Sequence, residues 1–441
     1  MKGVRSILDQ NAFSFTDNSG DPEINRLVAK RLETVGPTSM LFYRKPLHIV
    51  KGEGVWLYDA AGERYLDVYN NVQSVGHCHP RVVEAVSRQM AELNVHTRYL
   101  HEGIHRYAGR LLETMPAPLD RMVMTCTGSE SNDMALRLVR HYTGRQGIIV
   151  TEAAYHGNTT AVTEISPSSL KKRDPAEHVY VVPVAGLTAQ GENAGHWFAE
   201  QVREGIRTLD SRGYGCAALI VDTIFSSDGV FADPAGFLQE AVGAVQAQGG
   251  LFIADEVQPG FGRTGDAMWG FARHALQPDV VTMGKPMGNG FPMSAVVARE
   301  ALLAALAEEE GYFNTFGGNS VAVAAGNAVL DVIEDEGLMQ NAKAVGHYLK
   351  TALQVLARDF AELGDIRGAG LFIGVDFVDA DGDPDAGRAT AVINELRNKG
   401  VLIGAAGKYG NSLKIRPPLV FSQAHADIFI ERLSAAVLAT R

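Results

Sequence analysis

The segment "VVTMGKPMGNG" at residues 280–290 decides the fold of this chain and the place of its chemistry. Residues 280–284 form an apolar run that is typical of a buried strand, and Lys285 follows directly, ahead of a glycine-rich turn. A strand fixes the position of the residue behind it, and glycines let a ligand approach the backbone closely. The segment therefore predicts a lysine delivered to a binding site at the end of a buried strand.

Apolar runs recur around this segment, between about residues 80 and 335, and helical stretches separate them. They read "RMVMTC", "GIIVTEA", "HVYVVPV", "CAALIVDTI", "GLFIADEV", "DVVTMG" and "SAVVA". Strands that alternate with helices predict a mostly parallel sheet that is covered on both faces. Open parallel sheets bind ligands outside the carboxyl ends of their strands, so the residues that follow each run are the candidates for a site.

The flanking segments have a different pattern and predict a second, smaller domain. Residues 1–38 read as helical and polar, and residues 48–72 read as short antiparallel strands. After residue 336, helical and strand-like stretches mix in the manner of an α+β domain. We predict an α/β fold in which residues 76–335 form the large domain, while residues 1–75 and 336–441 contribute to the small domain.

The composition excludes several classes of protein. With 441 residues, 46% of them hydrophobic, the chain is too long for one small core. A formal net charge of -11 argues against a nucleic-acid or anionic-membrane partner. The N-terminus lacks the apolar core of a signal peptide, and no stretch approaches the about 18–20 apolar residues of a membrane helix. The three cysteines form no C-x-x-C pair, so we expect a cytoplasmic protein without a disulfide framework or a metal site.

Four strand ends carry groups that suit a single ligand. Lys285 supplies an amine, Asp255 a carboxylate and Tyr155 an aromatic ring, while Gly128 and Ser129 open a helix whose free N–H groups make an anion seat. Taken singly, these features have ordinary explanations, as a surface lysine, a helix cap or a packed ring. Pyridoxal 5'-phosphate (PLP) needs all four, because it carries an aldehyde, a ring nitrogen that needs an acid, a phosphate and a stacking face.

Several segments carry a family resemblance. They read "GHCHPRVVEAV", "TGSESNDMALRLVRHYTG", "YHG", "DEVQPGFGRTG", "MGKPMGNG", "NTFGGNS" and "IRPPL". In them the chain resembles the class III (subgroup II) aminotransferases, which are fold-type I PLP enzymes, from about Leu41 to the C-terminus. The resemblance implies a large domain with a mostly parallel seven-stranded sheet and a smaller α+β domain.

The resemblance also implies roles around the cofactor. Lys285 would form a Schiff base with PLP, Asp255 would hold a proton on the ring nitrogen, and Gln258 would lie near the ring hydroxyl. The freed amine of Lys285 would then move the α-proton of the substrate. The other implied cofactor contacts are Gly128, Ser129, Tyr155, His156 and Gly157, with Thr315 reaching the phosphate of the neighbouring subunit in a homodimer with shared sites.

For the substrate the resemblance implies less. Arg416 matches an arginine that commonly grips a substrate carboxylate, and Tyr43 and Arg98 are further candidates. Many ω-amino-acid members of the family mask that arginine with a glutamate, whereas Ser227 stands at the equivalent place here. We therefore expect Arg416 to be an open anion receptor, with a structural salt bridge to an acidic residue as the alternative.

Two reactions fit these residues, and we predict transamination from an amino acid or amine to a 2-oxo acid. A second likeness, in "NVQSVGHCHP", "RYLH", "YFNTFGG" and "GLFIGVD", is to the branch of the family that contains phospho-lyases. Those enzymes eliminate phosphate from phosphorylated amines such as phosphoethanolamine or phosphohydroxylysine, and there Arg416, Arg98 or Arg44 would hold the substrate phosphate. Arg98 equally suits a solvent or interface position.

Other questions stay open at this point. A PLP-binding regulator without enzymatic activity is a third reading, which the intact Lys285 and Asp255 argue against. The sequence does not name the amino donor or acceptor. It also does not decide between a dimer and a tetramer made of two dimers.

Overall fold

A computed structural model of the protein describes residues 11–441. The helix expected within residues 1–38 is realised as α1 (Pro22–Val35), and the first ten residues of that stretch lie outside the described part. Helix α1 begins where it does because Pro22 occupies its first turn and the Asp21 carboxylate accepts the backbone N–H of Glu23 at 2.8 Å.

The centre of the fold is a seven-stranded sheet with the strand order β4-β10-β9-β8-β7-β5-β6. Its strands are β4 (Arg121–Thr125), β5 (Gly147–Thr151), β6 (Val179–Val182), β7 (Cys216–Val221), β8 (Leu251–Asp255), β9 (Val280–Met283) and β10 (Ser294–Ala298). Strand β10 runs antiparallel to both neighbours, and the pairs from β9 to β6 are parallel. The seven apolar runs of the sequence therefore form the mostly parallel sheet that was predicted.

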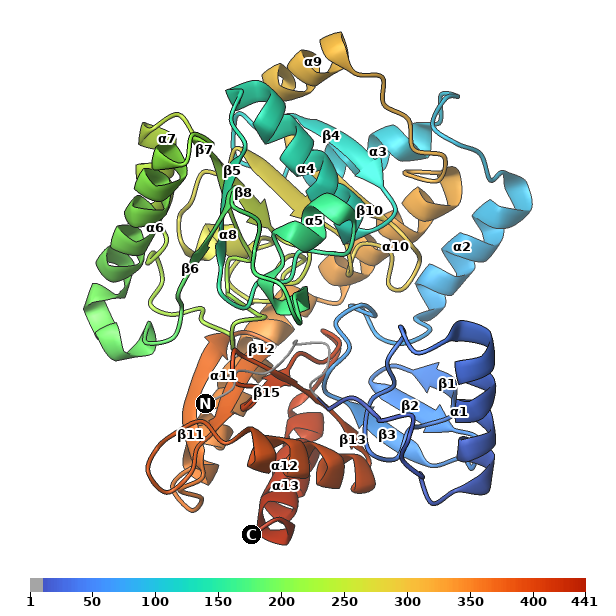
Figure 1. The fold of residues 1–441 in the computed structure, drawn as a ribbon. Helices are drawn as coiled ribbons and strands as arrows, with labels where there is room; N and C mark the ends of the chain where they lie inside the picture. Colours follow the sequence, from blue (N-terminus) through green and yellow to red (C-terminus); the bar gives the residue numbers. More distant parts are fainter. Residues whose placement is uncertain (1–10) are drawn as a thin grey trace.

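The sheet is buried on both faces, as its continuous apolar strands require. Successive residues of a strand point to opposite faces, so Ile148 and Val150 of β5 pack in one cluster and Ile149 between them packs in another. The first cluster includes Met134 and Leu138 of α4 (Gly128–Thr143). The second cluster includes side chains of α6 (Ala194–Ser211) and α7 (Gln239–Ala247), and in Figure 1 these two helices lie on the opposite side of the sheet from α4.

The other helices surround this core and the smaller part of the molecule. They are α2 (Pro80–Glu92), α3 (Glu102–Leu112), α5 (Thr160–Glu164), α8 (Gly270–Arg273), α9 (Glu300–Glu309), α10 (Ser320–Asp335), α11 (Leu338–Leu356), α12 (Ala386–Asn398) and α13 (Gln423–Ala439). Helix α10 packs against both α2 and α3, and α11 leads the chain from the large sheet into the lower part of Figure 1.

Two four-stranded sheets build that lower part. One has the order β1-β2-β3-β13, from β1 (Ile49–Glu53), β2 (Trp56–Asp59), β3 (Arg64–Asp67) and β13 (Val401–Leu402). The other has the order β11-β12-β15-β14, from β11 (Leu363–Ala369), β12 (Phe372–Phe377), β15 (Ser412–Ile415) and β14 (Gly404–Ala406). Because β3 and β13 pair in parallel, segments from the two ends of the chain share one sheet. The domain bounds at residues 76 and 336 stay a prediction.

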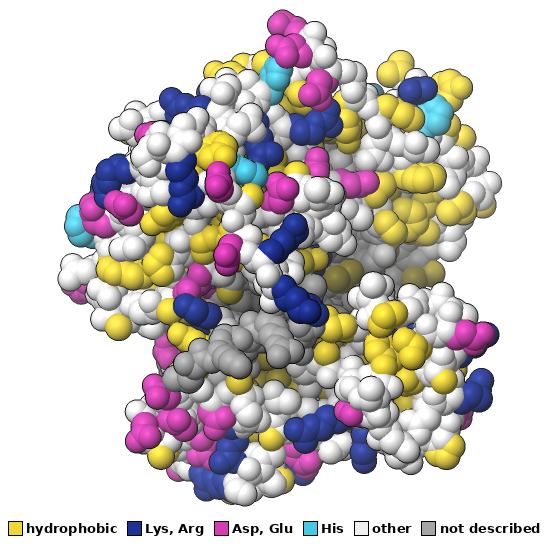
Figure 2. All heavy atoms as spheres, in the orientation of Figure 1, with side chains coloured by type: hydrophobic (Ala, Val, Ile, Leu, Met, Phe, Trp, Pro, Cys, Tyr) yellow, Lys and Arg dark blue, Asp and Glu magenta, His cyan; other side chains and the backbone are white. Residues whose placement is uncertain are grey.

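The surface is hollowed where the large sheet region meets the two small sheets (Figure 2). This hollow faces the carboxyl ends of the parallel strands, which is where an open α/β sheet binds its ligands. Within residues 11–441, no helix is long and apolar enough to cross a membrane.

Candidate active site

Two adjoining cavities, of ≈ 190 and ≈ 200 Å³, lie at the ends of the parallel strands and share Tyr155, Gln258 and Lys285 in their walls. We call the cavity that also contains Gly128 and Asp255 the cofactor seat. We call the cavity that also contains Lys414 and Arg416 the anion subsite. The seat is built from the strand ends of the large sheet, and the subsite adds residues from the small sheets.

The anion-binding end of the cofactor seat is the start of α4. The Thr127 side chain accepts the N–H of Glu130 at 3.2 Å, and the Glu130 carboxylate accepts the N–H of Thr127 at 3.1 Å. This capping box leaves the N–H groups of Gly128 and Ser129 without a partner among the described residues. Free N–H groups at a helix N-terminus favour a negatively charged ligand such as a phosphate.

Gly157 brings a second loop against this helix start. It has φ +142, and a Cβ atom there would lie 2.5 Å from the Ser129 hydroxyl oxygen and 2.7 Å from the Ser129 Cα. Any other residue would push the two loops apart. The following residue, Asn158, donates its N–H to the Ser129 hydroxyl at 3.1 Å, which fixes the cradle from the other side.

Asp255 ends β8 and is 4% exposed, and donors surround its carboxylate. Oδ2 accepts from the Asn132 side-chain amide at 3.0 Å and from His156 Nδ1 at 2.7 Å, and Oδ1 accepts the N–H of Val257 at 3.0 Å. Asn132 is itself fixed by the Thr282 hydroxyl, which donates to its Oδ1 at 2.7 Å. These three donors fix the position of the carboxylate in the cavity wall, where it can accept a hydrogen bond from a protonated ring nitrogen.

Lys285 lies two residues beyond β9 and is half-buried, with its amine in both cavities. Burial, reinforced by the positive charge of Arg416, lowers the pKa of Lys285 to about 8, although Asp255 and Asp222 act in the opposite direction. A sizeable fraction of the amine is therefore neutral near pH 7–8, as a nucleophile or a base must be.

The seat fits PLP on the chemistry of its donors. The free N–H groups at Gly128 and Ser129 suit the phosphate, the Asp255 carboxylate suits the ring nitrogen, and the Lys285 amine suits the aldehyde. His156 Nε2 is buried without a hydrogen-bond partner and lies in the same cavity wall, as expected for a group that faces a polar ligand. Tyr155 is half-buried beside it, and burial raises the pKa of its hydroxyl.

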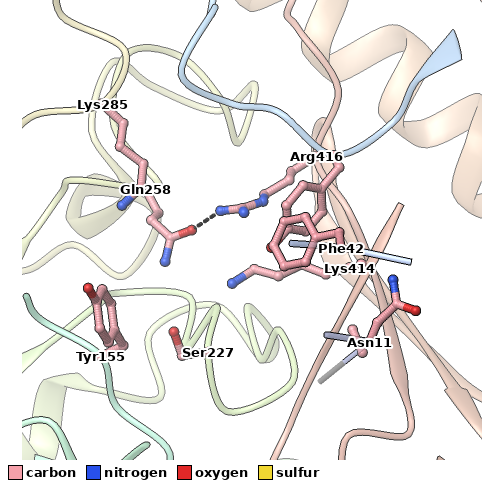
Figure 3. Close-up of a pocket in the computed structure, with 11 residues that line it drawn as sticks. Asn11, Phe42, Tyr155, Ser227, Gln258, Lys285, Lys414 and Arg416 are labelled. Atoms are coloured by element: carbon pink, nitrogen blue, oxygen red, sulfur yellow. Dashed lines mark hydrogen bonds between the residues drawn. The ribbon is translucent and has the colours of Figure 1, made fainter. Parts of the chain in front are cut away.

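The anion subsite holds two buried basic side chains, one in β15 and one just beyond it. Lys414 in β15 is 4% exposed, and Arg416 just beyond β15 is 8% exposed. Residues two apart on a strand point to the same side, and Figure 3 shows both side chains directed into the cavity, with Lys285 and Ser227 on its other walls. In the described chain, neither cation forms an ion pair with an acidic side chain.

Arg416 is held by neutral groups. Its Nη1 donates to the side-chain oxygen of Gln258 (dashed in Figure 3), and its guanidinium lies 4.3 Å from the ring centre of Tyr69. Its Nε is buried without a partner. The structural salt bridge that was the alternative for Arg416 is thus absent from the described part of the chain. Ser227, expected near Arg416, does line the same cavity.

Three sequence candidates for substrate contact lie outside both cavities. Tyr43 is a correction: its side chain is buried, and its hydroxyl both donates to Ile403 O and accepts Ile403 N–H at 3.1 Å, while its neighbour Phe42 lines the subsite instead. Arg98 is exposed and lies 3.8 Å from the Phe313 ring centre, so the expected substrate contact is not made within one chain. Arg44 is also exposed and lines neither cavity.

Thr315 lies on an exposed stretch away from both cavities. Its expected role was toward a neighbouring subunit, so it stays a prediction.

Sequence reasoning missed several groups of the site. Lys414 carries a usable signal, because it stands two residues before Arg416 in the apolar strand "SLKI", where a lysine is out of place unless it faces a ligand. Asn132 sits among the buried residues of α4, where an amide needs a specific partner. Tyr69 and Gly404, which shape the subsite around Arg416, carry no signal in one sequence.

Comparisons with known proteins agree with this geometry. The family model described as Aminotransferase class-III matches residues 42–437. A Drosophila melanogaster protein named alanine–glyoxylate aminotransferase 2-like is 39% identical over 91% of this chain and 84% of its own length. A Caenorhabditis elegans protein named ethanolamine-phosphate phospho-lyase homolog 1 is 38% identical over 90% of each.

Solved structures lead to the same family. A phospholyase from Arthrobacter, solved in complex with phosphoethanolamine, has a TM-score of 0.89 and 41% identity, and the match covers 94% of this chain and 99% of that chain. Two further relatives are named mitochondrial, so the cytoplasmic location stays a prediction. With its family match, its fold and its cofactor seat in agreement, the chain belongs to the class-III aminotransferase family of PLP-dependent enzymes.

Proposed function

We propose that this enzyme eliminates phosphate from a small phosphorylated amine such as phosphoethanolamine. This choice reverses the preference for transamination that the sequence suggested. The observation that carries it is the pair of buried cations, Lys414 and Arg416, in one cavity with Lys285.

The charge of the subsite favours a dianion. A carboxylate carries one negative charge and can be held by one arginine through two parallel hydrogen bonds. Here a second cation, Lys414, lies in the same cavity. Burial and the charge of Arg416 lower the pKa of Lys414, so a ligand that brings two negative charges, as a phosphate monoester does, would favour its ammonium form and pair with both side chains. Arg98 and Arg44, the other sequence candidates for this phosphate, line neither cavity.

The comparisons support the proposal at the level of the family. Similar proteins carry both names, aminotransferase and phospho-lyase, over nearly the whole chain. The solved phospholyase has a match of the same extent and was crystallised with a phosphorylated amine. These names describe those proteins, and the choice between the reactions for this chain depends on its own residues.

The proposed reaction divides between the two cavities. When bound, PLP supplies a ring that can accept the electrons released when the α-proton of the substrate is removed. Asp255 holds the proton on the ring nitrogen, and Lys285 Nζ takes the proton from the carbon that bears the amine. Lys414 and Arg416 hold the phosphate, which leaves the adjacent carbon with the electrons of the C–O bond. With one water, phosphoethanolamine would give acetaldehyde, ammonia and inorganic phosphate.

One assay tests the proposal. The enzyme is incubated with phosphoethanolamine, and separately with amino acids plus pyruvate or 2-oxoglutarate, and both inorganic phosphate and the aminated cofactor are measured. Phosphate release without the aminated cofactor is the expected result. Aminated cofactor without phosphate release contradicts the proposal, and PLP binding without turnover of any amine would favour the non-enzymatic reading.

Lys414→Met sharpens this assay. Removing one of the two basic side chains should raise the KM for phosphoethanolamine by roughly 30- to 100-fold, the lower end of the range for truncating one charge of a buried contact. Lys399→Met is the matched control, because Lys399 pairs with Glu395 on α12 away from both cavities and should leave KM unchanged.

Transamination is the second candidate function, and one observation favours it. No acidic side chain of the described residues masks Arg416, so the arginine is free to bind the carboxylate of an amino acid. In that case an amino acid plus a 2-oxo acid would be turned over, and Lys414→Met would have little effect.

We also propose that the enzyme works as a homodimer. Exposed apolar side chains gather on two neighbouring segments of the surface, and Leu100 at 95% and Phe316 at 69% are the most exposed of them. The two segments touch where Arg98 lies over Phe313, and Thr315 belongs to the second one. Analytical ultracentrifugation tests this, and Leu100→Asp with Phe316→Asp should shift the protein toward monomer, whereas a monomeric unmodified protein would contradict it.

A further inference from the structure

Asp67 is a fully buried carboxylate that lines neither cavity and that the proposed reaction does not use. It ends β3, and its Oδ1 accepts the backbone N–H of Tyr69 at 3.0 Å and that of Asn70 at 2.8 Å. An aspartate that accepts the N–H two residues ahead of it fixes a turn in one conformation. The path of the chain beyond β3, and with it the position of the Tyr69 side chain, therefore depends on this carboxylate.

His77 contacts the other oxygen of Asp67. Its Nε2 lies 2.6 Å from Asp67 Oδ2, and both side chains are buried. The backbone fixes His77 in turn, because its N–H donates to Gly54 O at 2.7 Å and its carbonyl accepts the Gly54 N–H at 3.1 Å. A Cβ atom at Gly52 would lie 2.9 Å from His77 Cβ, so the chain packs closely against this residue. Both oxygens of Asp67 thus have partners, which hold the carboxylate in one orientation.

The residues that follow Asp67 contact Arg416 directly. Val68 O accepts the backbone N–H of Arg416 at 2.9 Å. The ring centre of Tyr69 lies 4.3 Å from the Arg416 guanidinium, and Tyr69 lines the anion subsite. One backbone contact and one side-chain contact of Arg416 therefore come from the turn that Asp67 fixes. An arginine that already rests on an aromatic ring loses less conformational freedom when it binds an anion.

A second aspartate of the same sheet has the same set of contacts without this neighbour. Asp59 Oδ1 accepts the N–H of Ala61 at 3.0 Å and that of Glu63 at 2.9 Å, and its Oδ2 accepts the Tyr65 hydroxyl at 3.0 Å. This turn joins β2 to β3, and its residues line neither cavity. Asp59 shows that such a carboxylate can serve the sheet alone. Asp67 differs from it in what its turn places beside the subsite.

We propose that Asp67, oriented by His77, is a positioning residue for substrate binding, because it fixes the turn that holds Tyr69 against Arg416. The inference rests on the proposed function in that Arg416 binds the anion of the substrate. It holds equally for a phosphate and for a carboxylate. Asp67 should therefore affect KM and not kcat, since its turn contacts Arg416, whereas Lys285 belongs to a different loop.

The experiment uses the PLP-loaded enzyme and ethyl phosphate, which lacks an amine and cannot react. Calorimetry gives its dissociation constant for the unmodified enzyme, Asp67→Ala, Asp67→Asn, Tyr69→Leu and the double variant Asp67→Ala/Tyr69→Leu. We expect Tyr69→Leu to bind about 10-fold more weakly and Asp67→Ala about 3- to 10-fold more weakly, within the range of a cation–π contact. Asp67→Asn should stay within about 2-fold, because its amide oxygen accepts the same two N–H groups and its amide nitrogen can donate to His77.

The double variant separates positioning through the ring from a general structural role. If Asp67 acts through Tyr69, Asp67→Ala should weaken binding no further in the Tyr69→Leu background. The same loss in both backgrounds overturns the inference. Asp59→Ala is the matched control: it should lower the thermal midpoint and leave the dissociation constant unchanged. Equal weakening by Asp59→Ala and Asp67→Ala would mean that loss of sheet stability is the cause, and the inference falls.

His77→Ala carries the same test if Asp67→Ala does not fold. It removes the partner of Asp67 Oδ2, so binding should weaken about 3-fold in the unmodified background and not at all beside Tyr69→Leu. His77→Gln should restore the affinity, because its amide can donate to Asp67. With phosphoethanolamine as substrate, KM should rise by the same factor as the dissociation constant. A fall in kcat, or loss of the PLP absorption band, overturns the inference.

The same data separate this inference from the proposed function. If phosphoethanolamine releases no phosphate but ethyl phosphate binding follows Asp67 through Tyr69, the positioning role stands and the proposed elimination falls. If phosphate is released but Asp67→Ala binds ethyl phosphate as tightly as the unmodified enzyme does, the elimination stands and this inference falls. If the unmodified enzyme does not bind ethyl phosphate, Arg416 is not a phosphate receptor and both fall.

Discussion

The cofactor seat and the anion subsite share a wall, but they differ in whether their charged side chains have partners within the protein. In the seat, the Asp255 carboxylate is matched by donors from Asn132, His156 and Val257. In the subsite, Lys414 and Arg416 are buried without an acidic partner in the described chain. The carboxylate of the seat is thus paired with donors of the protein itself, whereas the basic side chains of the subsite lack the negative charge that a ligand would bring.

The difference teaches where rigidity and selectivity come from in this enzyme. A satisfied buried network holds one geometry, which suits a cofactor that stays in place through many turnovers. Unpaired buried cations are costly, and a ligand that pairs with them gains what the free protein lacks. On the proposed function, substrate choice would depend mainly on residues from the small sheets, and the chemistry on residues at the strand ends of the large sheet.

The largest effect is expected at Lys285, one of the three residues that line both cavities. Lys285→Ala should abolish the absorption band of the PLP–lysine linkage and lower turnover by at least about 10⁴-fold, since it removes both the attachment and the acid–base group. Absorption spectra and initial rates measure this. A variant that retains both band and turnover would show that Lys285 is not the reacting lysine.

Removing the matched charge of the seat should have the next largest effect. Asp255→Ala should bind some PLP but lose about 10²- to 10³-fold in rate, because nothing then holds the proton on the ring nitrogen. Asn132 and His156 would also lose their acceptor, at a cost of about 1–3 kcal/mol each in the free energy of unfolding. Rates at saturating substrate and thermal unfolding separate the two effects; full activity would remove the role of Asp255.

The pH dependence of PLP capture tests whether the charge of Arg416 in the subsite lowers the pKa of Lys285. Only a neutral amine attacks the aldehyde, so with the pKa of Lys285 at about 8, capture by PLP-free protein should rise about 50-fold from pH 6 to pH 8 and then level off. Arg416→Met removes a charge that lowers this pKa, so the rise should move to higher pH. Stopped-flow absorbance follows capture. A rise that continues to about pH 10 in the unmodified protein would mean that Lys285 behaves as an ordinary lysine.

The smallest expected effect comes from the packing behind Arg416. A Cβ atom at Gly404 would lie 2.4 Å from the Tyr69 ring, so Gly404→Ala must move the ring on which the guanidinium stacks. We expect KM to rise about 3- to 10-fold, in keeping with the energy of a cation–π contact, while kcat changes little.

Gly243→Ala is the matched control for that variant. Gly243 lies in α7 with nothing within 4 Å of the added atom, so neither constant should change. If Gly404→Ala lowers kcat as much as it raises KM, the subsite affects the reaction step as well as substrate binding, and the proposed division of roles between the two cavities is wrong.

Much of the seat could be predicted from the sequence because its residues follow apolar strands at short, fixed spacings. Asp255 ends one strand, Lys285 follows the next, and Gly128 opens the helix after a third. Adjacent parallel strands bring such residues together whatever the rest of the chain does. The mostly parallel sheet was predictable for the same reason, since its strands read as continuous apolar runs.

The substrate end could not be predicted in the same way because it depends on how two parts of the molecule meet. Lys414 is buried only because β15 faces the strand ends of the large sheet, which no local pattern encodes. Tyr43 was a substrate candidate from the resemblance alone, and in the structure, where the chain has φ 69 at this residue, its hydroxyl is hydrogen-bonded to the backbone of Ile403. Phe42, one residue earlier in the chain, lines the anion subsite in its place.

The pairing of β3 with β13 has a consequence for the order in which the chain folds during its synthesis. Leu66 finds its partner, Val401, only near the far end of the chain, and Arg416 donates its N–H to Val68 O from further on still. During synthesis, the parallel strands of the large sheet can assemble before β13, the last strand of the β1-β2-β3-β13 sheet, has been made. A ribosome-bound chain that lacks its last stretch therefore already has the lysine and the acid, but not the arginine that would select a substrate.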